Sequence, residues 1–112
     1  MPYTVLKSWG KEIWYWNSDR YCYKHLVFDR NMGCSFHYHM KKDEIFHVLK
    51  GAVTIRYSWG DDIAQAHEKL LSEGDVFHVP TMMRHKITAD CMTSAVLAEV
   101  STTHSEDDSY RI

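Results

Sequence analysis

The chain has 112 residues and a net charge of −2, and 45% of its residues are hydrophobic while 25% are charged. This composition is typical of one globular domain, and it offers no basic patch for nucleic acid. No apolar run reaches the roughly 18 residues of a membrane span, and the first residues lack the apolar stretch of a secretion signal. We therefore predict a single cytoplasmic domain over residues 1–112.

Short segments of strand-forming residues alternate with turn residues along the whole chain. Turns such as residues 17–19 and 59–62 separate these segments at the spacing of an all-β sandwich or barrel. Residues 63–71 are ambiguous, with some helical spacing, but the segment is short and lies between two turns. The predicted strands cover residues 3–6, 12–16, 21–28, 35–39, 44–49, 52–57, 66–71, 75–79, 85–88 and 94–100.

Aromatic residues gather near the N-terminus, at Trp9, residues 14–16, Tyr21 and Tyr23. Adjacent residues of a strand point to opposite faces, so one aromatic layer cannot enter the barrel. That layer could cover a partner subunit or stack against a sugar ring, and packing is the more frequent use of large aromatics. We therefore predict a homodimer.

Three histidines and one carboxylate stand at spacings that suit a metal ion. His37 and His39 are two residues apart, so they leave a strand on the same face. Glu44 opens the next predicted strand after a polar turn, and His85 opens a later one. A lone histidine at such a position is usually an ordinary polar residue, but four groups together favour a metal. Imidazole and carboxylate suit Zn, Mn, Fe, Ni or Cu, so the pattern predicts one divalent transition metal of open identity.

The first of these segments resembles a known sequence motif. His37, His39, Glu44 and Gly51 match the first cupin motif, in which His-x-His is followed by Glu and then Gly. Gly33 stands two residues closer to the histidine than the motif's leading glycine does.

A second cupin motif is matched over residues 74–89 by Gly74, Pro80 and His85. Met82 replaces the usual glycine, and Ala89 replaces the usual asparagine. The resemblance implies a cupin double-stranded β-helix, the jelly-roll barrel, with a metal-site core over about residues 33–89. It implies these metal ligands: His37, His39, Glu44 and His85.

Residues 7–10, 70–80 and 98–111 look similar to the cupin domain of type II phosphomannose isomerases. This resemblance implies a metal-assisted aldose–ketose isomerisation of a sugar or sugar phosphate. Glu99 and His47 are the candidates for the proton-transferring base, although strand parity turns His47 away from the ligands and Glu99 could equally be a paired residue of the barrel. Arg111 matches an arginine of that family and could hold a phosphate or carboxylate by a bidentate fork, or be solvated at the chain end. His37 departs from that family, which commonly has glutamine there.

Two other functions are compatible with the same ligands. One is a dioxygenase-type cupin in which the metal activates oxygen, and the other is a cupin that only binds a sugar or small metabolite. A requirement for oxygen would indicate the first, and ligand-induced stabilisation without turnover would indicate the second.

The cysteines are odd in number and widely spaced, at Cys22, Cys34 and Cys91. This spacing predicts reduced thiols and no disulfide framework. Cys34 stands three residues before His37, so strand parity predicts that it faces away from the ligands.

Overall fold

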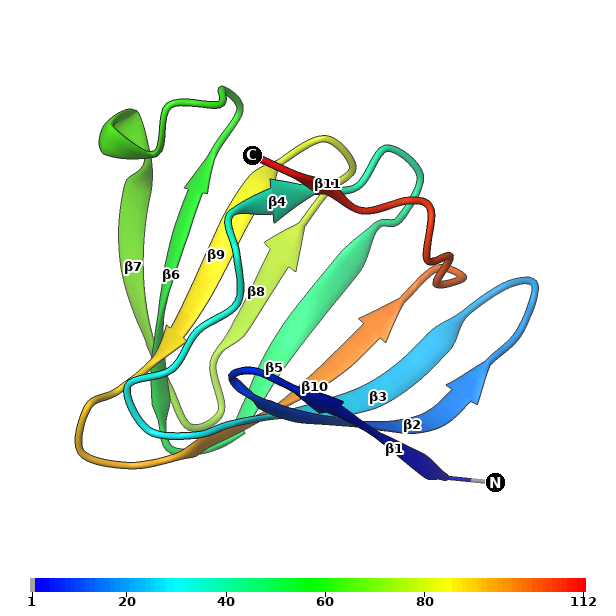
Figure 1. Ribbon diagram of the computed structural model, residues 1–112, viewed down its shortest axis with the longest axis horizontal. Coiled ribbons are helices and arrows are strands. Elements are labelled where there is room, and N and C mark those ends of the chain that lie inside the picture. The colour runs from blue at the N-terminus through cyan, green and yellow to red at the C-terminus, as the bar shows by residue number, and fades with distance from the viewer. Residues whose placement is uncertain (1) are drawn as a thin grey trace.

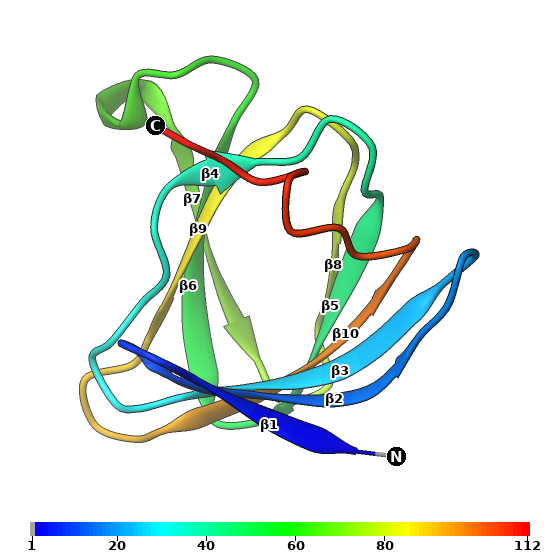
Figure 2. The same cartoon turned by 45° about the vertical axis from the view of Figure 1, so that its right-hand side comes forward.

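Within residues 2–112, which the computed structural model describes, eleven strands form two sheets that curve around one interior (Figures 1 and 2). The six-stranded sheet has the spatial order β1 (Tyr3–Lys7), β2 (Gly10–Asn17), β3 (Cys22–Phe28), β10 (Ala95–Ser101), β5 (Glu44–Lys50) and β8 (Val76–Val79). The five-stranded sheet has the order β11 (Tyr110–Arg111), β4 (His37–Tyr38), β9 (Arg84–Ala89), β6 (Ala52–Ser58) and β7 (His67–Ser72). Neighbouring strands are antiparallel throughout.

The predicted all-β class is confirmed, and each of the ten predicted strands is present. The ambiguous segment divides into a 3₁₀ turn, η1 (Ile63–Gln65), and strand β7. The side chain of Asp62 begins that turn by accepting a hydrogen bond from the Ala64 N–H. Strand β11 was not predicted. No helix in the described part of the chain is long and apolar enough to cross a membrane.

The interior changes from apolar to polar along the strands. On β3, Lys24 points inward together with Leu26 and Phe28, because these positions share one strand face. On β5, Glu44 likewise precedes the buried Phe46. Residues from both sheets form the apolar core, which comprises Trp9, Leu26, Phe28, Phe46, Val48, Val53, Ile55, Leu71, Val79, Ile87, Ala89, Ala95 and Leu97. One end of the barrel is therefore packed, and the other end carries charged and imidazole side chains.

Three positions of the matched motifs have left-handed backbone, at Gly51, Gly74 and Met82. Gly51 has φ +77°, and a Cβ at this position would lie 2.4 Å from the Ser94 carbonyl oxygen, so the close approach requires glycine. Met82 has φ 73°, although it carries a side chain. Its N–H donates to the His39 carbonyl oxygen at 2.7 Å. The turn that supports His39 is therefore retained without the usual glycine, at a backbone cost of about 1 kcal/mol.

The N-terminal aromatic residues divide between the two faces, as expected. Trp9 and Trp14 are buried, whereas Trp16 is 54% exposed. The register of β2 shifts between Trp14 and Trp16, so Tyr15 occupies a bulge. An outward aromatic layer is thus present, and the homodimer inferred from it stays a prediction.

Candidate metal centre

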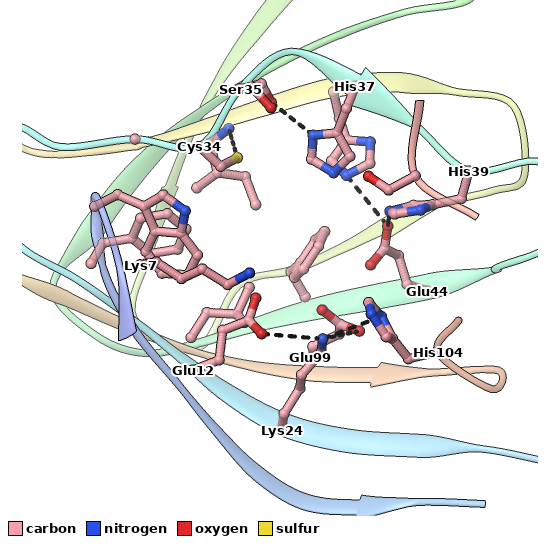
Figure 3. Close-up of a pocket in the computed structure, with 18 of the residues that line it drawn as sticks. Lys7, Glu12, Lys24, Cys34, Ser35, His37, His39, Glu44, Glu99 and His104 are labelled. Carbon is pink, nitrogen blue, oxygen red and sulfur yellow. Dashed lines mark hydrogen bonds and ion pairs between the residues drawn. The ribbon is translucent and has the colours of Figure 1, made fainter. Parts of the chain in front are cut away.

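Three histidine side chains converge at the polar end of the barrel (Figure 3). His37 lies on β4 and His39 directly follows it, and His37 is paired in register with His85 of β9. One ring nitrogen from each histidine lies within 4.8 Å of the others, and His39 and His85 are buried. These three residues could therefore hold a metal ion.

Each of the three rings is fixed by a backbone carbonyl on its outer side. The Nδ1 atom of His37 donates to the Ser35 oxygen at 2.7 Å, and that of His39 donates to the Asp108 oxygen at 2.7 Å. The Nδ1 atom of His85 lies 3.2 Å from the Met83 oxygen. A carbonyl only accepts hydrogen bonds, so in each neutral ring Nδ1 carries the proton and Nε2 keeps a lone pair. This is the arrangement that orients histidine ligands in metal sites.

Glu44 brings a carboxylate oxygen to the same point from the opposite sheet. Its Oε2 atom lies 3.4 Å from Nε2 of His39 and 3.3 Å from Nε2 of His85. This oxygen is buried and has no hydrogen-bond partner within the described residues. Lone pairs of oxygen and nitrogen thus face one another with no protein hydrogen between them, which is unfavourable unless a cation or a proton lies there. The residues present therefore fit a bound metal ion.

Burial decides the protonation of this cluster. It lowers the pKa of His37 to about 3 and that of His85 to about 3, and the neighbouring positive charges act in the same direction. Burial also lowers the pKa of His39 to about 4. The imidazoles are therefore neutral at pH 7, as metal ligands must be. Burial, followed by the charge of Glu99, raises the pKa of Glu44 to about 8, so without a cation this carboxyl retains a proton.

The histidines open onto a cavity of about 640 Å³ between the two sheets. Glu99 and Arg111 both line it, so the structure brings the two expected catalytic residues to the same cavity as the expected ligands. Arg111 is exposed at the edge of the cavity, where β11 pairs with β4 and places it opposite His37. His47 lies on the other face of β5, outside the residues that line the cavity, in agreement with its parity.

Glu99 is buried on β10 and is paired with lysines. Its Oε2 atom accepts from Lys42 Nζ at 3.0 Å and from Ser101 Oγ at 3.1 Å, and it lies 4.0 Å from Lys24 Nζ. Burial raises the pKa of Glu99, but the two lysine charges and these hydrogen bonds outweigh burial and lower it to about 2. Glu99 is therefore an anion that holds an ammonium group in the cavity, and a weak proton acceptor.

Four charged or polar residues of this end were not predicted from the sequence. Lys24 and Lys42 are both buried, and the imidazole of His104 lies 3.4 Å and 3.2 Å from their ammonium groups. Glu12 forms an ion pair with Lys24 at 3.6 Å. The sequence could have indicated that Lys24 points inward, because it lies two residues before Leu26 and therefore on the same face of the strand. Lys42 and His104 lie in loops, where parity gives no information.

The expectation for Cys34 was wrong. Its side chain lines the same cavity as His37 instead of facing away from it (Figure 3). Strand parity fails here because β4 contains only His37 and Tyr38, and residues 34–36 are irregular. The Cys34 sulfur accepts a hydrogen bond from the Ile87 N–H at 3.3 Å, and burial raises the pKa of the thiol to about 11. Cys34 is therefore an uncharged residue in the lining of the cavity.

The C-terminal segment lies beside β4 at this end of the barrel (Figures 1 and 2), and hydrogen bonds of Asp108 join it to His39 and the loop that follows. Both carboxylate oxygens of Asp108 accept backbone N–H groups, which come from Met40, Lys41 and Lys42. Its carbonyl oxygen is the one that fixes the ring of His39. A single buried aspartate therefore holds the loop that connects two of the converging groups.

Comparison with known proteins identifies the fold family. The cupin family model matches residues 24–109, a span that includes all three converging histidines. CapF, a capsular polysaccharide assembling protein from Staphylococcus aureus, is 20% identical with a TM-score of 0.86, and the match covers 100% of this chain and 34% of CapF. KdgF from Halomonas sp. is 20% identical with a TM-score of 0.73, covering 87% of this chain and 81% of KdgF.

Oxalate decarboxylase from Bacillus subtilis has a TM-score of 0.84 at 16% identity, and the match covers 99% of this chain and 30% of that enzyme. The chain thus spans about a third of CapF and of oxalate decarboxylase. Comparison with the curated proteins finds no match. At these identities the similar structures establish the barrel architecture alone. Because the family match covers most of the barrel, the chain belongs to the cupin family.

Proposed function

We propose that this protein is a metal-dependent cupin whose ion is bound by His37, His39, Glu44 and His85. The observation that carries the proposal is the buried Glu44 oxygen without a hydrogen bond, facing imidazole nitrogens that have lone pairs. Nitrogen and carboxylate ligands of this kind suit Zn, Mn, Fe, Ni or Cu. The cavity beside the histidines leaves room for a small molecule to reach the ion.

As its reaction we propose the aldose–ketose isomerisation of a sugar or sugar phosphate, following the resemblance to type II phosphomannose isomerases. The bound ion would act as a Lewis acid toward oxygens of the substrate. The chain itself must then stabilise the negative charge that develops on the substrate. Lys42 suits this role, because its ammonium lies 3.6 Å from Glu44 and is held by Glu99. The low pKa of Glu99 and its hydrogen bond from Lys42 support a positioning role for Glu99, and the proton that moves between the two reacting carbons then needs an acceptor other than this carboxylate.

Arg111 is proposed to bind the phosphate of a phosphorylated substrate at the exposed edge of the cavity. The Arg111→Ala variant should bind mannose 6-phosphate about fivefold more weakly, because one exposed charge-assisted contact contributes about 1 kcal/mol. Its affinity for unphosphorylated mannose should not change. Isothermal titration calorimetry measures both, with Arg30→Ala, an exposed arginine outside the cavity, as the matched control. Equal affinity of Arg111→Ala and the unaltered protein for mannose 6-phosphate would rule out the phosphate contact.

The metal content of the protein tests the proposed function directly. Protein purified without chelator or histidine tag should contain about one transition-metal ion per chain by mass spectrometry, and His39→Ala should lose it. His78→Ala is the control, because His78 is exposed and pairs with Asp43 away from the cavity. A chain that binds no metal even after reloading would refute the four-ligand site and leave a metal-free binding cupin.

The loaded protein is then assayed for interconversion of mannose 6-phosphate and fructose 6-phosphate. Metal without isomerisation, but with oxygen uptake that depends on an added substrate, would replace the isomerase by the dioxygenase-type alternative.

A further inference from the structure

The cavity has a second polar surface across from the histidines, shown at the bottom of Figure 3. We call it the ionic wall, and it consists of Glu12, Lys24, Lys42, Glu99 and His104. Within this wall, Lys42 has close partners, with its ammonium 3.0 Å from Glu99 and 3.2 Å from His104. Two of its three hydrogens therefore have protein acceptors within 3.2 Å.

Lys24 is buried like Lys42, but among the described residues its ammonium has no polar partner closer than 3.4 Å. Its side chain is only 2% exposed, yet its nearest polar atoms lie at 3.4 Å on His104, 3.6 Å on Glu12 and 4.0 Å on Glu99. Good N–H···O bonds measure about 2.7–3.2 Å, and an ammonium has three hydrogens to place. The remaining contact is the face of Trp14, at 4.1 Å. Lys24 therefore has spare donor capacity in a place that lines the cavity.

Glu12 supplies an acceptor next to this donor. Its Oε1 atom accepts from the Trp14 indole N–H at 2.9 Å and pairs with Lys24. Its other oxygen, Oε2, has no hydrogen bond from the described residues, and the residue lines the cavity. A hydroxyl group donates and accepts at once, so it can bridge this pair.

The charges of the ionic wall favour a neutral group over an anion. Two lysines stand against two glutamates, so a carboxylate placed here would gain no net attraction and would meet the two existing carboxylates. Farther along the same cavity the lining is apolar, at Trp9, Leu26, Phe28, Phe46 and Ile87. Such a surface suits the C–H groups of a carbon chain that carries hydroxyls.

We propose that Lys24 and Glu12 form a hydroxyl-binding subsite for the neutral carbon chain of a polyhydroxylated ligand. Glu99 and His104 hold the two lysines in position. The inference rests on the proposed function in one respect, since it takes the reacting end of an open-chain sugar to lie at the histidines. The polyol chain then extends from the histidines into the barrel, along the ionic wall.

The test measures binding of two probes to the metal-loaded protein by calorimetry and by tryptophan fluorescence. The probes are sorbitol, a neutral polyol, and gluconate, its carboxylate counterpart. Sorbitol has no carbonyl group, so its binding does not depend on turnover. Lys24→Met keeps the stem that packs on Trp14 and removes the ammonium, and Lys69→Met, on the exposed strand β7, is the matched control.

Sorbitol should bind the unaltered protein and Lys69→Met equally, and should bind Lys24→Met about tenfold more weakly. Glu12→Gln, which changes a partly exposed group, should also weaken sorbitol binding. Metal content measured for every variant separates this result from failure of the metal site. The proposal is overturned if sorbitol does not bind, or if Lys24→Met and Glu12→Gln both bind sorbitol with unaltered affinity. It is also overturned if Lys24→Met weakens the binding of gluconate alone, which would indicate a carboxylate subsite.

Discussion

Replacing Asp108 with alanine is expected to lower the affinity of the protein for its metal ion about 10- to 100-fold. The substitution should also lower the free energy of unfolding by about 3 kcal/mol, because three consecutive backbone N–H groups lose a charged acceptor, and that acceptor is itself buried. The carboxylate receives the N–H groups of Met40, Lys41 and Lys42, which lie between His39 and Glu44. Without it, the loop no longer holds the two ligands at a fixed separation.

Competition with a fluorescent zinc chelator measures the affinity, and urea denaturation of the metal-free protein measures the stability. Asp107→Ala is the matched control, because Asp107 is the adjacent carboxylate but is exposed and accepts its hydrogen bond from Ser105, away from the ligand loop. The zinc affinity and the stability of Asp108→Asn should lie between those of Asp108→Ala and Asp107→Ala, since an amide retains one acceptor oxygen. Unchanged zinc affinity in Asp108→Ala would show that the C-terminal segment does not organise the site.

The contribution of Asp108 explains why the site was only partly predictable. His37 and His39 are two residues apart, so local strand geometry was sufficient to place them on one face. Asp108 acts on His39 across 69 positions of sequence, through a carbonyl that every residue possesses. Its carboxylate looked like one of several acidic residues in a polar tail. Contacts of this kind depend on how distant loops pack, and residue type alone does not reveal them.

The fold was more predictable than the cavity, for a related reason. Alternation of apolar residues locates strands, and ten of the eleven were found in this way. Alternation also puts Lys24 on the face of Leu26 and Phe28, but a lysine in that pattern gives no hint of its partners. Those partners, Glu12 and Glu99, come from the two neighbouring strands, and the register that joins them is a property of the sheet. The interior charges could therefore be located only in the folded chain.

The metal-free protein is expected to lose stability steeply as the pH falls from about 6 to about 4.5. The ordinary pKa of histidine is 6.5, and in the folded chain those of His37, His39 and His85 are lowered to about 3, about 4 and about 3. Between these limits the unfolded chain binds three more protons than the folded chain, so stability rises with pH there. Glu44 opposes this, because its pKa, raised from 4.5 to about 8, gives the folded chain one extra proton in the same range.

The net difference is about two protons, which corresponds to about 3 kcal/mol per pH unit. Urea denaturation of chelator-treated protein between pH 4.5 and 6 measures this slope. His85→Gln should remove the contribution of about one proton from this slope, whatever its effect on absolute stability. His78→Gln should leave the slope unchanged, because His78 is exposed and lies outside the cluster. A flat profile, or one that rises on acidification, would mean that these imidazoles are not held neutral. In the metal-loaded protein, stability should fall even more steeply on acidification. Glu44 is then ionised, and protons compete with the metal for the same nitrogen atoms.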